Sequence, residues 1–256
     1  MSGRKTDIAL VLVDFDDTLV DTAPRFRQAR RALFALLAEA GFPEEEARRI
    51  HHEEVDPVML ERFGLGPRRL EPAFCETYHR LCARAGIRPD PAVREQCAAI
   101  ARSVLGAAPP FDGAIEALAR LAARFPTVVY TQAGDPDYQF RCIQEVGVTR
   151  VLPPDRIRIC WRKTPEEFLA TIHRYGVRDP RQAWMVGNSI RSDVNPALTV
   201  GARAILIESR EPWEHDLVDP VSNDYVQAGS FAEAVAYLLG RHAAERARAP
   251  RGAACR

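Results

Sequence analysis

Short apolar segments that do not alternate with polar residues recur along the chain. Four such runs occur, at residues 9–13, 127–130, 184–186 and 204–207. Strands that are apolar on both faces are typical of a parallel sheet covered by helices on both sides. The alternating run RIRIC at residues 156–160 predicts a more exposed strand, and residues 225–227 predict a short last one.

Helical patterns lie between these runs from about residue 110 to residue 240. Asp112 is placed to cap a helix whose apolar face includes Ile115 and Leu118. Residues 164–167 (TPEE) and 230–233 (SFAE) match the capping box, in which a hydroxyl residue precedes an acid by three positions. This alternation of strands and helices predicts an α/β domain with a doubly wound, Rossmann-like parallel sheet.

The strand signal disappears over residues 22–108. Leu33 and Leu37 lie at helical spacing, and Gly41 is placed to end that helix. Further helical segments are predicted at residues 44–52, 58–63, 72–85 and 91–105. Because a compact domain does not carry a structureless loop of this length, we expect an all-helical cap inserted into the α/β core.

The predicted organisation therefore has three parts. Residues 1–21 and 109–242 form the α/β core, and residues 22–108 form the helical cap. Residues 243–256 are rich in arginine and poor in apolar side chains, which predicts a solvated, disordered tail.

Composition narrows the classes of partner. The chain has 256 residues, is 46% hydrophobic and has a formal net charge of zero, so nothing in its overall charge indicates a nucleic-acid partner. It has no apolar run long enough to span a membrane and no cleavage signal near its N-terminus, so we expect a cytoplasmic protein. The six cysteines show no metal-binding spacing and are expected to be reduced. The sequence does not predict the oligomeric state.

Polar residues follow the predicted strands where those strands end. Asp14 and Asp16 follow the first strand, Thr131 the second, Lys163 the exposed strand, and the acidic segment 187–193 the next one. Because ligands bind outside the carboxyl ends of strands in an open parallel sheet, we expect these side chains to converge. Lys163 is notable because the chain contains only one other lysine among its 35 basic residues, which favours a pocket that needs a compact ammonium.

Carboxylates held close together favour a hard cation such as Mg²⁺. A cation, a lysine and a hydroxyl group together can stabilise a phosphoryl group, and a neighbouring carboxylate can attack it.

The motif DFDDTL, then a strand-end threonine, a lysine and the segment GNSIRSDVNPALTVGARAILI resemble, in this order, the haloacid dehalogenase superfamily in its helical-capped phosphatase branch. The resemblance covers residues 8–240. It implies that Asp14 is the nucleophile and that Asp16 is the general acid and base. It also implies that Thr131 and Lys163 bind the phosphoryl group. It implies Mg²⁺ as the cofactor, with the ligands Asp14, Asp16, Asn188 and Asp193. The implied activity is hydrolysis of a small phosphorylated metabolite through an aspartyl-phosphate intermediate.

Two positions depart from the commonest family pattern. Asn188 stands where an aspartate usually follows the glycine, and Gln132 follows Thr131 where a smaller residue or asparagine is common. A sugar-phosphate mutase, a 2-haloacid dehalogenase and a non-catalytic binding module of the same fold are the alternatives. Asp16 argues against the dehalogenase, because that branch lacks the acid at this position.

Several charged residues have simpler interpretations. Asp17 is expected to be a solvated turn residue, with Thr18 fixing the turn through a local hydrogen bond. His51 and His52 are expected on a solvated helix surface. Arginines 25, 27 and 30 of the cap are predicted to form an ordinary polar helix face rather than a substrate contact.

Overall fold

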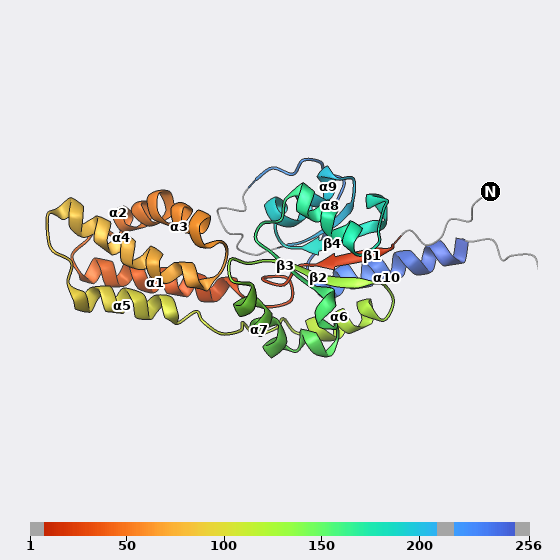
Figure 1. Ribbon diagram of the computed structural model, residues 1–256, viewed down its shortest axis with the longest axis horizontal. Helices are drawn as coiled ribbons and strands as arrows, with labels where there is room; N and C mark the ends of the chain where they lie inside the picture. The colour runs from red at the N-terminus through yellow and green to blue at the C-terminus, as the bar shows by residue number, and fades with distance from the viewer. Residues whose placement is uncertain (1–7, 209–217, 249–256) are drawn as a thin grey trace, which may run out of the picture.

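Six parallel strands form a single sheet at the centre of the core. The computed structural model describes residues 8–208 and 218–248 (Figure 1). The strand order is β3-β2-β1-β4-β5-β6. The strands are β1 (Leu10–Val13), β2 (Thr127–Gln132), β3 (Ile157–Cys160), β4 (Ala183–Gly187), β5 (Arg203–Ile207) and β6 (Val226–Ala228). The predicted fold class is confirmed, and each predicted strand is present within a residue or two of its expected limits.

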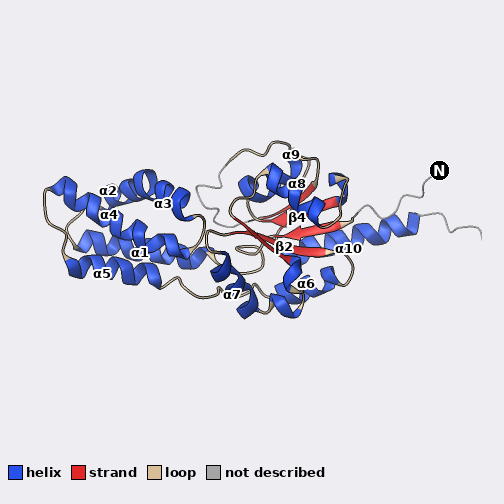
Figure 2. Ribbon diagram, viewed as in Figure 1, coloured by secondary structure: helices blue, strands red, loops and turns tan. Residues whose placement is uncertain are grey.

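Helices cover both faces of this sheet (Figure 2). Val11 and Val13 of β1 pack with the helices of one face, and the alternating Leu10 and Leu12 pack with those of the other. The first face is covered by α6 (Ala114–Ala122), α7 (Pro136–Val146) and α10 (Phe231–Arg248). The second is covered by α8 (Pro165–Arg174) and α9 (Asn195–Thr199). Burial on both faces explains why the strands are continuously apolar in sequence.

A helical cap lies at the end of the sheet where β1 ends (Figure 1). Its helices are α1 (Ala23–Glu39), α2 (Glu44–Arg49), α3 (Asp56–Phe63), α4 (Leu70–Ala85) and α5 (Pro91–Arg102). A π-helical turn, Ile50–Val55, joins α2 to α3. These helices have a hydrophobic core of their own, which includes Leu33, Leu37 and Phe74. No helix of the described residues is long and apolar enough to cross a membrane.

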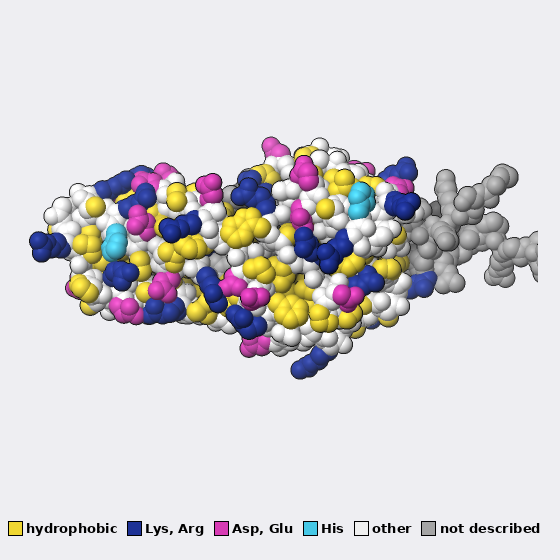
Figure 3. All heavy atoms as spheres, in the orientation of Figure 1, with side chains coloured by type: hydrophobic (Ala, Val, Ile, Leu, Met, Phe, Trp, Pro, Cys, Tyr) yellow, Lys and Arg dark blue, Asp and Glu magenta, His cyan; other side chains and the backbone are white. Residues whose placement is uncertain are grey.

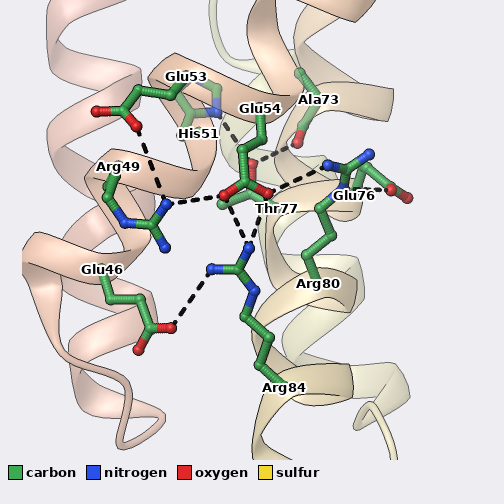
Figure 4. Close-up of polar contacts among 10 residues, drawn as sticks. All are labelled: Glu46, Arg49, His51, Glu53, Glu54, Ala73, Glu76, Thr77, Arg80 and Arg84. Carbon is green, nitrogen blue, oxygen red and sulfur yellow. Dashed lines mark hydrogen bonds and ion pairs between the residues drawn. The ribbon is translucent and has the colours of Figure 1, made fainter.

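Ion pairs hold the π-helical turn against α4. Glu54 accepts hydrogen bonds from Arg84 at 2.8 and 2.9 Å and from Arg49 at 2.9 Å (Figure 4). Arg80 approaches the same carboxylate at 3.4 Å. The hydrogen bonds from Arg84 and Arg49 lower the pKa of Glu54. Acidic and basic side chains are interspersed in this way over the visible surface, in keeping with the zero net charge (Figure 3).

The cap contacts the core directly next to the carboxyl edge of the sheet. The backbone N–H of Gly134 donates to the carbonyl of Leu65 at 2.7 Å, and Arg68 pairs with Asp135 at 2.7 Å. A Cβ atom on Gly134 would lie 1.8 Å from the carbonyl oxygen of Phe63, so only glycine permits this approach. The contact therefore depends on the absence of a side chain at Gly134.

Three expectations about local structure are wrong. Helix α6 begins after Gly113 without a side-chain cap, so Asp112 does not cap it. The chain of residues 243–248 continues helix α10 instead of forming a tail, and residues 249–256 lie outside the described residues. His51 is completely buried in the cap, because the π-helical turn directs it toward Phe74 and Thr77 rather than toward solvent.

Candidate functional site

A cavity of about 930 Å³ lies between the cap and the carboxyl edge of the sheet. All six residues predicted for the site line it: Asp14, Asp16, Thr131, Lys163, Asn188 and Asp193. They converge because parallel strands bring their carboxyl ends to a single edge. The cap residues that line the cavity come mainly from α1 and from the segment around Gly64.

The Lys163 ammonium joins two buried carboxylates. Its Nζ atom lies 2.5 Å from Oδ1 of Asp14 and 2.7 Å from Oδ1 of Asp193. Burial favours the neutral amine, but the charges of Asp14 and Asp193 outweigh that effect and raise the pKa of Lys163. The lysine is therefore held as a cation between Asp14, which follows β1, and Asp193, which lies in the turn after β4.

Burial also acts on the two strand-end acids. Burial is the largest effect and raises the pKa of Asp14 to about 7. The charge of Lys163 acts to lower this pKa, and the charge of Asp193 acts to raise it further. Burial raises the pKa of Asp16 as well, although hydrogen bonds from Thr22 and Gln139 oppose the shift. Three carboxyl groups share this space with one ammonium, and the raised pKa values of Asp14 and Asp16 mean that full ionisation is unfavourable there unless a further cation is bound.

Asp16 is fixed by donors from the cap hinge and from α7. Its Oδ1 accepts from the Thr22 hydroxyl at 2.7 Å, and its Oδ2 accepts from Nε2 of Gln139 at 2.6 Å. The same Nε2 lies 3.2 Å from Oγ1 of Thr131. Gln139 and Thr22 were missed by the sequence analysis, because no motif marks a residue that lies more than 120 positions from its partner or at a domain hinge.

Gln132 acquires a role that the sequence did not indicate. Its Oε1 accepts a hydrogen bond from the backbone N–H of Lys163 at 3.1 Å. Because β2 and β3 are paired neighbours, a side chain at the end of β2 can reach the loop that follows β3. Gln132 therefore positions the backbone from which Lys163 extends.

The turn after β1 departs from one prediction. Asp17 is not a solvated turn residue: it has a φ of 55°, and its carboxylate accepts from the backbone N–H groups of Thr22 at 3.0 Å and Ala23 at 2.7 Å. Burial raises the pKa of Asp17 to about 6. Thr18 does bond locally, to Oδ2 of Asp14 at 3.2 Å. Asp17 thus attaches the start of α1 to the loop that carries Asp14 and Asp16.

The segment after β4 packs tightly. Oδ2 of Asp193 accepts from the backbone N–H of Ser189 at 3.0 Å. A Cβ atom on Gly187 would lie 2.2 Å from the same oxygen, which explains the glycine in the motif. Asp193 is 1% exposed, and its interactions are with Lys163 and with its own loop.

The side chains predicted to bind a metal differ in how they are placed. Oδ2 of Asp14 and Oδ1 of Asn188 approach one hydroxyl, that of Thr18, at 3.2 and 3.4 Å, so these two oxygens face the same point. Asp16 and Asp193 are held by other partners. Within residues 8–208 and 218–248, no three acidic, histidine or cysteine side chains form a ready metal-binding group. An oxygen-binding cation therefore fits best at Asp14 and Asn188, because their oxygens are the two that face the same point.

The model of the family described as haloacid dehalogenase-like hydrolase matches residues 8–201, and that of HAD-hydrolase-like proteins matches residues 160–249. The chain belongs to the haloacid dehalogenase-like hydrolases. It is a hydrolase with the family's α/β fold, as the motifs indicated. No curated protein matches the sequence significantly.

Solved structures of other haloacid dehalogenase-like proteins share the fold. A family hydrolase from Xanthomonas campestris is 24% identical, with 95% of this chain and 96% of that chain covered and a TM-score of 0.77. YfnB from Bacillus subtilis, bound to magnesium, is 16% identical, with 90% and 98% covered and a TM-score of 0.57. L-2-haloacid dehalogenase from Xanthobacter autotrophicus is also 16% identical, with 91% and 99% covered and a TM-score of 0.56. Phosphatases occur among the similar structures too, so the fold alone does not distinguish the two reactions.

Proposed function

We propose that this hydrolase is a Mg²⁺-dependent phosphatase that acts on a phosphomonoester through an aspartyl-phosphate intermediate. The observation that carries the proposal is the different surroundings of two neighbouring carboxyl groups. Asp14 is paired with Lys163, whereas Asp16 is held by hydrogen bonds from Thr22 and Gln139. A nucleophile and a general acid and base are then supplied by two carboxylates with different partners.

In the first half-reaction a carboxylate oxygen of Asp14 attacks phosphorus, and the bond from phosphorus to the leaving oxygen breaks. Protonated Asp16 gives its proton to that oxygen, so the leaving group departs as an alcohol. Lys163 and the hydroxyl of Thr131 stabilise the negative charge of the phosphoryl oxygens.

In the second half-reaction Asp16, now a carboxylate, removes a proton from a water molecule. The water oxygen attacks phosphorus, and the bond from phosphorus to Asp14 breaks. Inorganic phosphate leaves, Asp14 is regenerated as a carboxylate, and Asp16 is again protonated. When bound, Mg²⁺ would be held by Asp14 and Asn188 and would offset the repulsion between the nucleophile and the phosphoryl oxygens.

Asp16 is also the feature that opposes the dehalogenase alternative. Halide is a good leaving group that needs no proton, so displacement of halide gives no reason to hold a second acid in the cavity. In this chain Asp16 is partly buried and has a donor on each oxygen, which is the arrangement expected for a positioned proton-transfer group.

The test is a panel of phosphomonoesters assayed for phosphate release with and without Mg²⁺, alongside chloride release from 2-chloropropionate. We expect phosphate release that requires Mg²⁺ and no chloride release. Asp14→Asn should abolish the activity, whereas Asp21→Asn, a neighbouring acid outside the cavity, should retain it. Chloride release without phosphate release would refute the proposal, and transfer of the phosphate to a second hydroxyl of the product would indicate a mutase.

A further inference from the structure

Trp161 is a large apolar side chain that the fold leaves uncovered. It is 48% exposed, whereas Trp184, the other tryptophan that the structure describes, is 2% exposed. Of the exposed large apolar side chains in residues 8–208 and 218–248, Trp161 is the one that lines the cavity. A tryptophan ring left open in the wall of a cavity is explained if a ligand covers it.

The edge of the indole ring meets the cap at Gly64. A Cβ atom on Gly64 would lie 3.1 Å from both Cη2 and Cζ3 of Trp161. These two atoms belong to the outer edge of the six-membered ring, so the contact does not require the faces of the ring to be covered. About half of the residue stays exposed in spite of it. The contact between cap and core therefore does not by itself account for the open surface of Trp161.

The loop that carries Trp161 is fixed on both sides. The carbonyl of Cys160 accepts from the backbone N–H of Ala133 at 2.9 Å, and the backbone N–H of Lys163 donates to Oε1 of Gln132 at 3.1 Å. Trp161 lies between these two points, two residues before the lysine. Two residues of chain span at most about 7 Å. The indole ring is therefore within reach of a leaving group attached to a phosphoryl group at Lys163.

The cap contributes apolar side chains that are likewise left out of the hydrophobic cores. Leu60 and Leu65 are half-buried, and both line the cavity. Neither they nor Trp161 belong to one of the three hydrophobic cores of the described residues. Leu65 directly follows Gly64, which lies against the Trp161 ring, so apolar surface from the cap and from the core meets at this end of the cavity. Apolar surface gathered in this way is typical of a site that binds an apolar group.

We infer that the leaving group of the substrate carries an aromatic ring, and that this ring stacks on Trp161. The inference rests on the proposed phosphatase activity and names its substrate class. A flat ring stacked on indole removes apolar surface of both from water, and aromatic pairs are stabilised beyond the area that they bury. A cavity of about 930 Å³ has room for a phosphoryl group together with such a ring.

The test compares 2-phenylethyl phosphate with 2-cyclohexylethyl phosphate and ethyl phosphate. The two rings are similar in size and cyclohexyl is the more hydrophobic, so a preference for phenyl reports stacking rather than burial alone. For the wild-type protein with Mg²⁺, we expect kcat/KM for the phenyl ester to be about threefold or more above that for the cyclohexyl ester. It should be roughly tenfold or more above that for the ethyl ester.

Substitutions at Trp161 test whether the ring is responsible. The ratio of phenyl to cyclohexyl kcat/KM should fall toward one in Trp161→Leu and should be largely kept in Trp161→Phe. Phe111→Leu removes an exposed aromatic ring outside the cavity and should leave the ratio unchanged. A nucleoside 5′-monophosphate preferred over ribose 5-phosphate, with loss of the preference in Trp161→Leu, would support the inference and identify the ring as a nucleobase. A preference confined to phenylalkyl phosphates would support it with a ring closer to the phosphate.

A binding measurement separates this inference from the proposed function. In 3-phenylpropylphosphonate and 3-cyclohexylpropylphosphonate a methylene group replaces the ester oxygen, so calorimetry with the wild-type protein measures affinity without turnover. Hydrolysis of the esters with no preference for phenyl, in rate or in affinity, would overturn the inference and leave the phosphatase intact. Preferential binding of the phenyl phosphonate with no hydrolysis of any ester would support the inference and refute the proposed activity.

Two further results would overturn the inference. One is a preference for phenyl that survives Trp161→Leu. The other is an equal loss of kcat/KM for ethyl and 2-phenylethyl phosphate in that variant, which would assign the ring to the contact with Gly64 alone.

Discussion

Nε2 of Gln139 donates to Oδ2 of Asp16 at 2.6 Å, across 123 positions of sequence. The contact joins α7 to the loop after β1, and Gln139 is itself buried. In the proposed mechanism Asp16 transfers protons, so Gln139 is a positioning residue that acts through it.

Replacement of Gln139 by methionine should therefore affect substrates according to their leaving groups. We expect the kcat for an alkyl phosphate to fall about tenfold or more, because its leaving oxygen needs a proton. The kcat for dinitrophenyl phosphate should fall much less. Gln144→Met, on the exposed side of the same helix, is the matched control. Equal losses for both substrates would show that Gln139 supports the fold rather than Asp16.

Lys163→Met should destabilise the protein, because it leaves the buried carboxylates of Asp14 and Asp193 without their cation. Breaking a buried ion pair on one side lowers the free energy of unfolding by about 3–5 kcal/mol. Urea unfolding measures this loss. The double variant Lys163→Met with Asp193→Asn should recover part of it, since one uncompensated charge is removed. Simple additivity of the two substitutions would show that Lys163 and Asp193 are not energetically coupled.

Asn188→Asp should tighten Mg²⁺ binding several-fold. Oδ1 of Asn188 and Oδ2 of Asp14 face the same hydroxyl, so the new carboxylate would stand beside the nucleophile. A second charge at this position should contribute on the order of 1 kcal/mol to binding of a divalent cation after screening. Calorimetric titration with Mg²⁺ gives the affinity, and Asn195→Asp, outside the cavity, is the control. Unchanged affinity would place the cation away from Asn188.

Gly134→Ala should loosen the contact between cap and core, because its Cβ would overlap the carbonyl oxygen of Phe63. Overpacking of this kind lowers stability by about 1–3 kcal/mol. Gly240→Ala is the matched control: it lies within α10 with no atom near its Cβ position, and should stabilise the protein by about 0.5–1 kcal/mol. Urea unfolding compares the two variants. Equal stability of Gly134→Ala and wild type would mean that the cap does not rest against this loop.

The buried His51 should make the cap sensitive to acid. Its Nδ1 lies 3.1 Å from the hydroxyl of Thr77, and this hydroxyl donates to the carbonyl of Ala73 at 2.8 Å, so the ring donates from Nδ1 (Figure 4). Nε2 has no hydrogen-bond partner among the described residues. Burial lowers the pKa of His51 to about 3, so the imidazole ring is neutral in the folded protein at neutral pH.

Because the folded pKa lies below the unfolded value of 6.5, the unfolded chain takes up the proton first. Stability is therefore complete above pH 6.5 and decreases as the pH falls from 6.5 toward 3, by about 2 kcal/mol at pH 5. His51→Asn should reduce this part of the pH dependence of the unfolding free energy, whereas the exposed His173→Asn should not. Parallel pH profiles for wild type and His51→Asn would show that His51 is not the group responsible.

The sequence by itself determined the parts of this protein that depend on local periodicity. Continuous apolar runs indicated strands buried on both faces, and the charged residues at their ends indicated which side chains would meet. Asp14, Thr131 and Lys163 could be found in this way because a parallel sheet brings all its carboxyl ends to one edge. The cap could be found as well, because the apolar residues of segment 22–108 recur at helical spacing.

Only the tertiary structure decided which groups hold those residues in place. Gln139 reaches Asp16, and Gln132 reaches the backbone of Lys163, because helices and strands distant in sequence pack side by side. No periodicity encodes such a contact. The burial of His51 likewise depends on a π-helical turn and on the helices packed around it, and not on the pattern of its neighbours in sequence. Arginines 25, 27 and 30 could be assigned to a helix from the sequence, but their place in the lining of the cavity was decided by how Asp17 and Thr22 attach α1 to the core.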